Sequence, residues 1–183
     1  PGELVIAVLQ DDPYDLPDCD FPVRQIVAGQ GGLALSAARN AAAWAARGDR
    51  LVFLDVDCIP DPGFVSEYRR HLAGFDGLVM GEVAYLPKGA TEGDLNFDHF
   101  DKIGVKHSDR QGPPAEGLRY CEDYRCFWSL NFAMRRADFR KAGGFDTRFH
   151  GYGGEDTDFG RMLDKKGIKI GWAKGARVYH QYH

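Results

Sequence analysis

Apolar runs alternate with amphipathic segments along the first half of the chain. Leu4–Leu9 is rich in β-branched residues and ends at Asp11-Asp12-Pro13, which predicts a strand followed by a turn. Val23–Val27 predicts a second strand, and the Ala-rich segment Leu33–Arg47 predicts a helix that a glycine ends. Leu51–Leu54 is apolar throughout, which is typical of a strand buried on both faces in a parallel sheet.

The order of the elements predicts the fold class. Asp61-Pro62 supplies an N-cap and a first-turn proline for the next helix, and Leu78–Tyr85 follows as a strand. Strand, helix, strand, helix and strand in succession predict an α/β fold. We therefore expect a mostly parallel central sheet flanked by helices.

The middle of the chain has a different pattern. Residues 86–122 are polar and show no strong periodicity, which favours a functional loop or lid, with a short helix near Leu95–Ile103. The elements expected after it are a strand over Phe127–Met134, helices over Arg136–Ala142 and 155–166, and short strands over Ile168–Trp172 and Arg177–Tyr179. We interpret residues 1–183 as one domain with segments 1–85, 86–122 and 123–183.

Composition narrows the class of protein. The 183 residues are 44% apolar and 27% charged, which is typical of a globular domain, and no apolar run is long enough to span a bilayer. The N-terminus lacks the basic region of a signal peptide, so we expect a cytoplasmic location, with membrane contact only at the periphery. The net charge of −4 argues against a nucleic-acid partner and favours a metal cation between this acidic chain and any phosphate-bearing ligand.

The four cysteines are Cys19, Cys58, Cys121 and Cys126, and they follow no zinc-site spacing. Reduced thiols are the favoured interpretation for this compartment. A disulfide between Cys121 and Cys126 is the alternative.

Asp55-Val56-Asp57 is the first candidate for chemistry, because it directly follows the apolar strand Leu51–Leu54. Ligands of open α/β sheets bind beyond the carboxyl ends of the strands. Two carboxylates two residues apart at that place can hold a hard divalent cation such as Mn²⁺ or Mg²⁺. The alternative is a solvated turn.

Tyr152-Gly153-Gly154-Glu155-Asp156 is the second candidate, because it opens a predicted helix. The glycines allow a ligand to approach the backbone closely, and a carboxylate here can take a proton from a hydroxyl group. The helix N-terminus lowers the pKa of such a carboxyl and burial raises it, and the sequence leaves the outcome open. The alternative is that the two acids only complement the helix dipole.

Histidines and further charged groups complete the set of candidates. His180 follows a short strand near the C-terminus and, with the acids, can complete a metal site; His183 is its alternative. Asp11 or Asp12, at the tip of the first strand, can accept hydrogen bonds from a base or ribose. Arg39 can contact a base or a phosphate. The alternatives are a turn cap and a helix-surface arginine.

The motifs in this order resemble the family-2 glycosyltransferases with the GT-A fold, a Rossmann-like architecture. The resemblance rests on ordered landmarks across nearly the whole chain outside 86–122. These are Ser36-Ala37-Ala38-Arg39-Asn40, Leu51–Asp57, Arg135–Phe139, Gly143-Gly144-Phe145-Asp146, Gly154–Phe159 and Val178-Tyr179-His180. The Gly-Tyr-Gly-Gly-Glu-Asp stretch is similar to the C-terminal half of β-1,4-galactosyltransferases and of chondroitin-type polymerases.

The resemblance implies a function and a role for each matching residue. It implies an inverting, metal-dependent transfer of a sugar from a nucleotide-diphospho-sugar, a UDP-sugar of the Gal, GalNAc or GlcNAc type, to a hydroxyl of a saccharide or other acceptor. Asp57, Asp55 and His180 match the metal site, with Mn²⁺ or Mg²⁺ as the cation. Asp156 matches the general base, and Glu155, with Tyr152, Gly153 and Gly154, matches the acceptor side. Asp11, Asp12, Arg39 and Asp55 match contacts to the donor nucleotide.

The chain departs from the family pattern at its start. It begins at what resembles the family's second strand. We therefore expect that the usual first strand and helix, about 30–40 residues in all, are lacking. In this layout 1–85 is the nucleotide-sugar half and 123–183 the acceptor half. Two rival hypotheses are a sugar-phosphate nucleotidyltransferase, which would release pyrophosphate, and a non-catalytic fragment of a larger polymerase that binds a nucleotide or carbohydrate.

Overall fold

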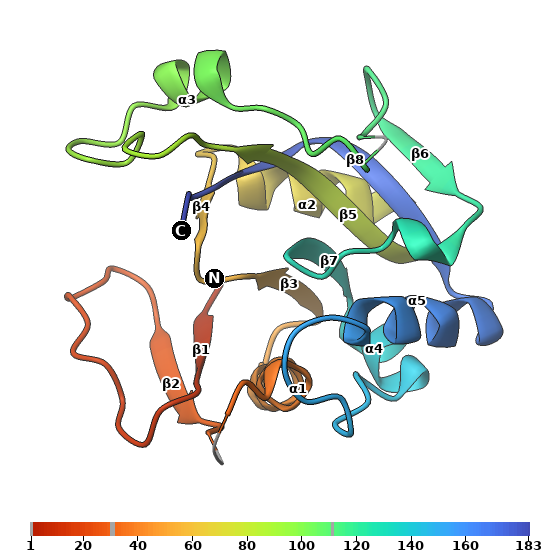
Figure 1. Cartoon of the computed structure of the whole chain (residues 1–183). Helices are drawn as coiled ribbons and strands as arrows, with labels where there is room; N and C mark the ends of the chain where they lie inside the picture. The colour runs from red at the N-terminus through yellow and green to blue at the C-terminus, as the bar shows by residue number, and fades with distance from the viewer. Residues whose placement is uncertain (1, 30–31, 111) are drawn as a thin grey trace.

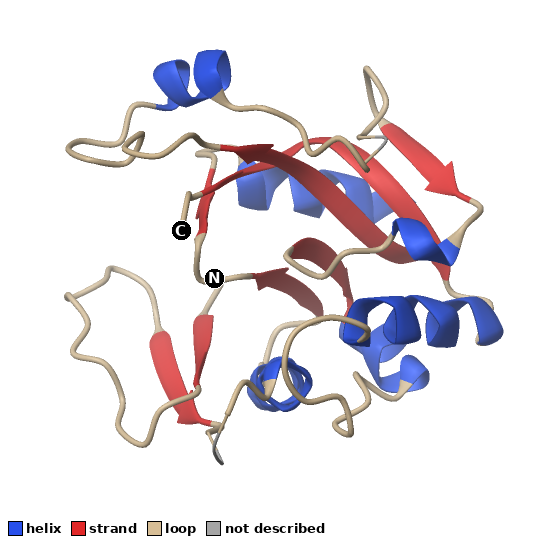
Figure 2. Ribbon diagram, in the orientation of Figure 1, coloured by secondary structure: helices blue, strands red, loops and turns tan. Residues whose placement is uncertain are grey.

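The computed structural model describes residues 2–29, 32–110 and 112–183. In these ranges a mixed sheet lies at the centre of the chain, with helices on both of its faces (Figures 1 and 2). Its strands, in spatial order, are β3 (Arg50–Leu54), β7 (Asn131–Arg135), β5 (Gly77–Tyr85), β8 (Lys169–His180) and β4 (Cys58–Pro60), and β6 (Leu118–Cys121) pairs with β8. A separate pair holds β1 (Leu4–Val8) beside β2 (Val23–Val27).

The strand directions are more mixed than the sequence predicted. β5 and β8 run parallel, as do β1 and β2, whereas β7 is antiparallel to both of its neighbours and β4 and β6 are antiparallel to β8. The α/β class is confirmed, but the central sheet is not mostly parallel. An apolar run indicates burial without giving direction, which explains the difference.

β3 also differs from the expectation of burial on both faces. Leu51 and Phe53 are buried, whereas Val52 and Leu54 are 39% and 37% exposed. β3 has one hydrogen-bonded neighbour, β7, and only one of its faces packs on the core. Because successive side chains point to opposite faces, covering one face alone explains the alternation, which the uniformly apolar sequence conceals.

One face of the sheet packs on α2 (Phe64–Gly74). Tyr68 and Leu72 of α2 are fully buried in a cluster with Val79 and Val178 of the sheet. The Tyr68 hydroxyl donates a hydrogen bond to Asn131 Oδ1 at 2.5 Å, so the polar tip of this buried ring is satisfied. A smaller cluster holds α3 (Phe97–Ile103) over the C-terminal part of β8.

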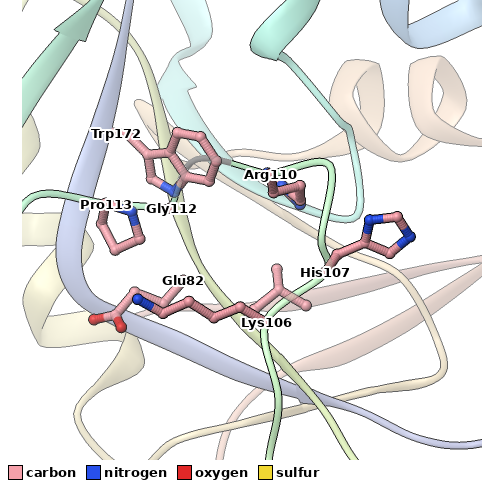
Figure 3. A pocket seen from close by; sticks show the side chains of 8 residues that line it. Glu82, Lys106, His107, Arg110, Gly112, Pro113 and Trp172 are labelled. Carbon is pink, nitrogen blue, oxygen red and sulfur yellow. The ribbon is translucent and has the colours of Figure 1, made fainter.

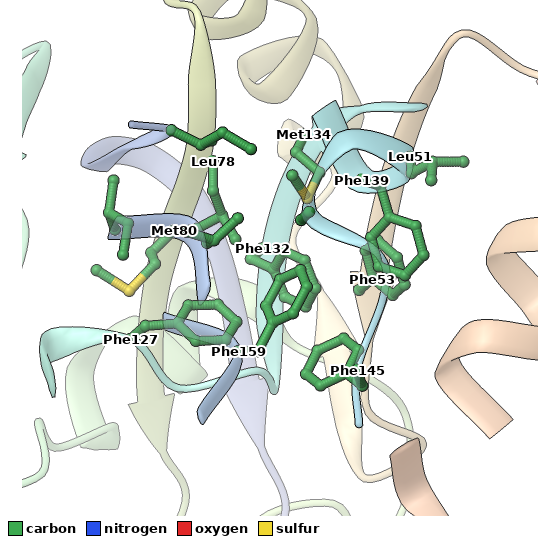
Figure 4. Close-up of a cluster of buried hydrophobic side chains, with 14 of the residues drawn as sticks. Leu51, Phe53, Leu78, Met80, Phe127, Phe132, Met134, Phe139, Phe145 and Phe159 are labelled. Carbon is green, nitrogen blue, oxygen red and sulfur yellow. The ribbon is translucent and has the colours of Figure 1, made fainter. Parts of the chain in front are cut away.

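The other face is dominated by phenylalanines (Figure 4). Phe53 stacks on Phe132 with ring centroids 4.3 Å apart, and Phe145 stacks on Phe159 at 4.2 Å. These rings, with Phe139, join β3 and β7 to α4 (Arg136–Ala142) and α5 (Glu155–Lys165). The cluster fixes α5, and so the start of that helix, relative to the end of β3.

Several element boundaries differ from the prediction. α1 covers Leu35–Ala45, while the helix and strand inside 86–122 are α3 and β6. The strand expected over Phe127–Met134 is shorter, because the 3₁₀ turn η1 (Tyr124–Cys126) and a connection precede β7. The two short C-terminal strands are one strand, β8, which continues through Gly175 at φ 94°.

The structure tests two expectations from composition, the state of the cysteines and the lack of a membrane-spanning helix. All four cysteines are free thiols, so the disulfide alternative for Cys121 and Cys126 is not formed. Among the described residues, no helix has the length and apolar character that a bilayer crossing requires. The division into segments 1–85, 86–122 and 123–183, and the lack of a family first strand, stay predictions.

Candidate active site

The Asp55–Asp57 turn directly follows β3. The Asp55 N–H donates to the Leu130 carbonyl at 3.1 Å, and the Cys58 N–H donates to the Asp55 carbonyl at 3.1 Å. Val56 between them is fully exposed. The backbone therefore closes a tight turn that carries two carboxylates at the end of a strand, where ligands of α/β sheets bind.

The chain brings Asp57, His180 and His183 together. One donor atom from each lies within 4.8 Å of the others. His180 Nε2 is 3.5 Å from Asp57 Oδ2, and His183 Nδ1 is 3.8 Å from the same oxygen. Pairing of Cys58 with His180 across β4 and β8, and a Gln181 N–H bond to the Asp57 carbonyl, place these side chains together.

The donor set fits a divalent cation. It comprises one carboxylate and two imidazoles, a combination that suits first-row metals such as Mn²⁺. His180 Nδ1 lies 2.9 Å from the Gln181 carbonyl, which accepts a hydrogen bond when this nitrogen carries the proton. In that tautomer Nε2 has its lone pair free on the side of Asp57.

Arg39 bridges the Asp55 turn to the start of α5. Its guanidinium contacts Asp55 Oδ1 at 3.1 Å and Glu155 Oε1 at 3.2 Å, and its side chain is only 11% exposed. Burial lowers the pKa of Arg39, but the charges of Asp55 and Asp156 outweigh it and hold the pKa above its ordinary value. The arginine stays charged and ties the two acidic segments together.

Glu155 and Asp156 form the first turn of α5, after Gly153 and Gly154 at φ 96° and 90°. Asp156 Oδ2 accepts a hydrogen bond from the Ser129 N–H at 3.1 Å, while Oδ1 is buried without a partner among the described residues. Burial raises the pKa of Asp156, against the lowering effects of Ser129 and Arg39. The competition that the sequence left open is therefore decided by burial.

The acceptor-side glycines lie in an exposed loop. Tyr152 is 92% exposed, and Gly151, Gly153 and Gly154 all have positive φ. A bond from the Gly151 N–H to the Leu33 carbonyl, 3.0 Å long, fixes the loop beside the start of α1. The loop leaves backbone and one aromatic ring open to a ligand next to Glu155.

Asp11 and Asp12 lie apart from this network. Both are exposed in the connection between β1 and β2, and within the described ranges neither carboxylate has a hydrogen bond or ion pair. The structure thus forms two clusters: Arg39 joins Asp55 to Glu155, and Asp57 lies against His180 and His183. Asp156 follows Glu155 on α5 and acts on Arg39 through its charge. The structure places the two N-terminal acids on a separate element.

The sequence analysis missed an aromatic row that continues the metal cluster. His183 lies against His180 at 5.3 Å, His180 against Tyr85 at 4.8 Å, Tyr85 against His107 at 5.6 Å, and His107 against Trp128 at 5.0 Å, all between ring centroids. It also missed Ser129, whose backbone binds Asp156. No local pattern marks these residues, because they come from four different segments.

Comparison with protein families identifies most of the chain. The model of glycosyl transferase family 2 matches residues 10–143, and that of the N-terminal domain of galactosyltransferase matches residues 115–183. The two matches overlap, and the first covers the Asp55–Asp57 turn while the second covers Glu155, Asp156 and His180.

Curated relatives agree with the family match. The hyaluronan synthase of Pasteurella multocida is 27% identical over 181 residues, which is 87% of this chain and 19% of that protein. The chondroitin synthase of Escherichia coli is 27% identical over 82% of this chain and 25% of its own length. A validoxylamine A glucosyltransferase of Streptomyces hygroscopicus subsp. jinggangensis is 29% identical, over 76% of this chain and 37% of its own. The chain thus spans between about a fifth and two fifths of these relatives.

Solved structures support the fold. A crystal structure of GalNAc-T7 with UDP, GalNAc and Mn²⁺ matches with a TM-score of 0.58 at 17% identity, over 88% of this chain and 32% of that one. This likeness shows the GT-A fold, an α/β architecture with a helix-flanked mixed sheet. Because the family model matches nearly three quarters of its length, the chain belongs to glycosyl transferase family 2.

Proposed function

We propose that this chain is the GT-A domain of an inverting, metal-dependent glycosyltransferase. It transfers a sugar from a nucleotide-diphospho-sugar to a hydroxyl of a saccharide or other acceptor. The observation that carries the proposal is the bridge that Arg39 makes between Asp55 and Glu155. This bridge joins the turn that carries a candidate cation ligand to the helix start that carries a candidate base.

Asp57, His180 and His183 would hold Mn²⁺ or Mg²⁺, with Asp55 at the side of the donor ribose. When bound, the cation supplies positive charge that stabilises the departing diphosphate. Within the chain, pairing of β4 with β8 holds Asp57 against His180 before any ligand arrives. That pre-organisation lowers the cost of assembling the site.

Asp156 is the proposed general base. Its buried Oδ1 has no protein partner among the described residues, so it is available to accept the proton of an acceptor hydroxyl. The raised pKa makes this carboxylate a stronger base than an ordinary aspartate. Attack of the activated hydroxyl on the face opposite the leaving group inverts the anomeric centre.

Arg39 is a positioning residue in this proposal. Both of its nitrogen contacts go to carboxylates of the chain, so its guanidinium is engaged before a nucleotide binds. It holds Asp55 and Glu155 in place rather than taking the nucleotide contact that the resemblance implied. Contacts to the base remain proposed for Asp11 or Asp12.

The donor and acceptor follow by analogy with the relatives. The structural neighbour contains UDP, GalNAc and Mn²⁺, which supports a UDP-sugar of the Gal, GalNAc or GlcNAc type. Relatives named as hyaluronan and chondroitin synthases support a saccharide acceptor, bound beside Tyr152, Gly153, Gly154 and Glu155. A cytoplasmic location stays a prediction.

A product assay tests the proposed function. Wild type and Asp156→Asn are incubated with Mn²⁺ and a panel of UDP-sugars and saccharide acceptors, and the released nucleotide is identified. We expect UDP and a new glycoside of inverted configuration from the wild type only. Release of pyrophosphate would contradict the proposal and favour nucleotidyl transfer, and nucleotide binding without product would favour a non-catalytic fragment.

A further inference from the structure

Arg110 lies between two indole rings in the connection between α3 and β6. The carbon at the centre of its guanidinium is 4.8 Å from the ring centroid of Trp128 and 4.9 Å from that of Trp172. Trp172 is buried and donates its indole N–H to the Gly81 carbonyl at 3.0 Å, so one wall of this sandwich is fixed. The rings hold the plane of the guanidinium in one orientation.

No carboxylate of the described residues forms an ion pair with this guanidinium. Its Nε and Nη1 are buried with no hydrogen-bond partner among the described residues, while Nη2 lies 4.0 Å from the Met80 sulfur and the Tyr85 side chain is the neutral group that acts on the guanidinium most strongly. Burial lowers the pKa of Arg110, and the groups that oppose this effect are Tyr85, Cys126 and Tyr68. Burial raises the pKa of Tyr85 and Tyr68, and a hydrogen bond with Cys121, together with burial, raises the pKa of Cys126, so these three groups stay neutral near pH 7.

A cavity opens beside this arginine (Figure 3). Its volume of about 20 Å³ has room for one water-sized group, and Lys106, His107 and Trp172 line it together with Arg110. Glu82 also lines it, but its carboxylate already accepts from the Gly175 N–H at 2.6 Å and from Lys174 and Arg177 at 3.1 Å. The cavity is therefore electropositive in a chain whose net charge is −4.

The cavity adjoins the candidate active site. His107, on its wall, contacts Tyr85 and Trp128 of the aromatic row that begins at His183 and His180. Arg110 also acts electrostatically on Cys58, the residue that follows Asp57. A group bound at Arg110 would therefore lie beside the aromatic row that leads to His180.

We propose that Arg110 and its cavity form a subsite for an oxyanion of a bound substrate, either a carboxylate on the acceptor saccharide or the diphosphate of the donor. Both present planar or tetrahedral anionic oxygens that a guanidinium binds with two parallel hydrogen bonds. A buried cation without a counter-ion is unfavourable, so binding of a substrate anion would compensate the desolvation cost of the Arg110 charge. The inference rests on the proposed function.

Three probes separate the two sources by isothermal titration calorimetry. Methyl β-D-glucuronoside and methyl β-D-glucoside differ in the carboxylate alone, and UDP with Mn²⁺ presents the diphosphate. Each is titrated into wild type, Arg110→Met and Arg125→Met. Arg125→Met is the matched control because it also removes one positive charge, from an exposed arginine whose ion-pair partner among the described residues is Asp123. Arg110→Lys, which keeps the charge without the fork, replaces Arg110→Met if the latter does not fold.

Selective binding of the glucuronoside that weakens at least about tenfold in Arg110→Met, but not in Arg125→Met, would support the carboxylate source. The same loss confined to UDP with Mn²⁺ would support the diphosphate source. Equal binding of all three probes by wild type and Arg110→Met would overturn the subsite. If the subsite fails in this way but UDP still binds and Asp57→Ala abolishes that binding, the proposed function is still supported. If the glucuronoside binds through Arg110 but UDP does not bind at all, the subsite is supported and the proposed function is contradicted.

Discussion

Two opposing effects act on Asp156 at the level of the single residue. Its place in the first turn of α5 favours the charged carboxylate, as do the Ser129 N–H and the charge of Arg39. Burial favours the neutral acid and dominates, so its pKa is raised. The group is held in a state that costs stability and makes it a better base.

We expect Asp156→Asn to lower kcat by about 10²- to 10⁴-fold, the usual effect of losing a general base. The wild-type rate should fall as the pH drops through the raised pKa of Asp156, because only the carboxylate accepts a proton. Rates of transfer over a pH series at saturating metal measure both effects. Unchanged transfer in the variant would assign the base to another residue.

Asp156→Asn should lower activity but raise the stability of the fold at pH 7. An acid with a pKa raised by folding stabilises the native state below its unfolded pKa of about 3.9 and loses that contribution as the pH rises through the folded pKa. Asp156→Asn should therefore have a higher Tm than wild type at pH 7, with the difference shrinking toward pH 3.5. Thermal unfolding at the two pH values measures this, and a variant less stable at pH 7 would contradict the raised pKa.

Arg39 should be important for stability as well as for position. Arg39→Met leaves the buried Glu155 without its counter-charge, and breaking a buried pair costs about 3–5 kcal/mol. Urea unfolding measures the loss, with Arg148→Met as control, because Arg148 is 89% exposed and pairs only with nearby Asp146. The control should be indistinguishable from wild type. Equal stability of both variants would contradict the bridging role.

The sequence predicted site residues best where a motif marks them locally. Asp55, Asp57, Glu155 and Asp156 stand in short motifs, and the structure joins Asp55 to Glu155 through Arg39 and places Asp57 against His180. The sequence could not give the partner of Arg39, because its contacts lie 16 and 116 positions away. No pattern in the sequence marks Arg110, because only the structure places it between Trp128 and Trp172.

At the level of elements, α5 is held by a close approach to η1. Gly160 lies in the buried face of α5, where an added Cβ would come within 2.7 Å of the Tyr124 carbonyl oxygen. Only a glycine permits this contact between helix and turn. The packing matters for function because the first turn of the same helix carries Glu155 and Asp156.

Gly160→Ala should therefore destabilise the chain by about 1–3 kcal/mol through overpacking, although alanine has the better helix propensity. It should also lower transfer activity by shifting the start of α5. Gly74→Ala is the matched control, because a Cβ at the end of α2 meets nothing within 4 Å. Urea unfolding measures the free energy of unfolding of both variants. Equal losses in the two variants would contradict a tight contact between α5 and η1 at Gly160.

The elements that the sequence predicted well are those with a local signal. Arg136–Ala142 was predicted with the observed bounds, and the helix over 155–166 is one residue shorter, because glycines precede or follow both. Strand direction was not predictable, since β7 inserts between β3 and β5 from a distant part of the chain. The continuity of β8 was hidden by Gly175, which interrupts its apolar pattern without ending the strand.

At the scale of the whole molecule, one core unites both family matches. Phe53 from the first half stacks on Phe132 from the second, and Phe145 and Phe159 continue the cluster to α5. The GT-A class was predictable because the order of motifs along the chain specifies it. The shared core explains why the Asp55–Asp57 turn and the start of α5 keep a fixed relation, which a two-site reaction requires.

The central claim is that Asp57 helps to hold a cation that binds the nucleotide. The most direct test is calorimetric titration of UDP into wild type, Asp57→Ala and Asp49→Ala, each with and without Mn²⁺. Asp49 is the control, because it is an exposed aspartate whose ion-pair partner in the described part of the chain is Arg136. We expect Mn²⁺-dependent binding in wild type and Asp49→Ala and none in Asp57→Ala. UDP binding that does not depend on Mn²⁺, or that is unchanged in Asp57→Ala, would contradict the claim that Asp57 holds the cation.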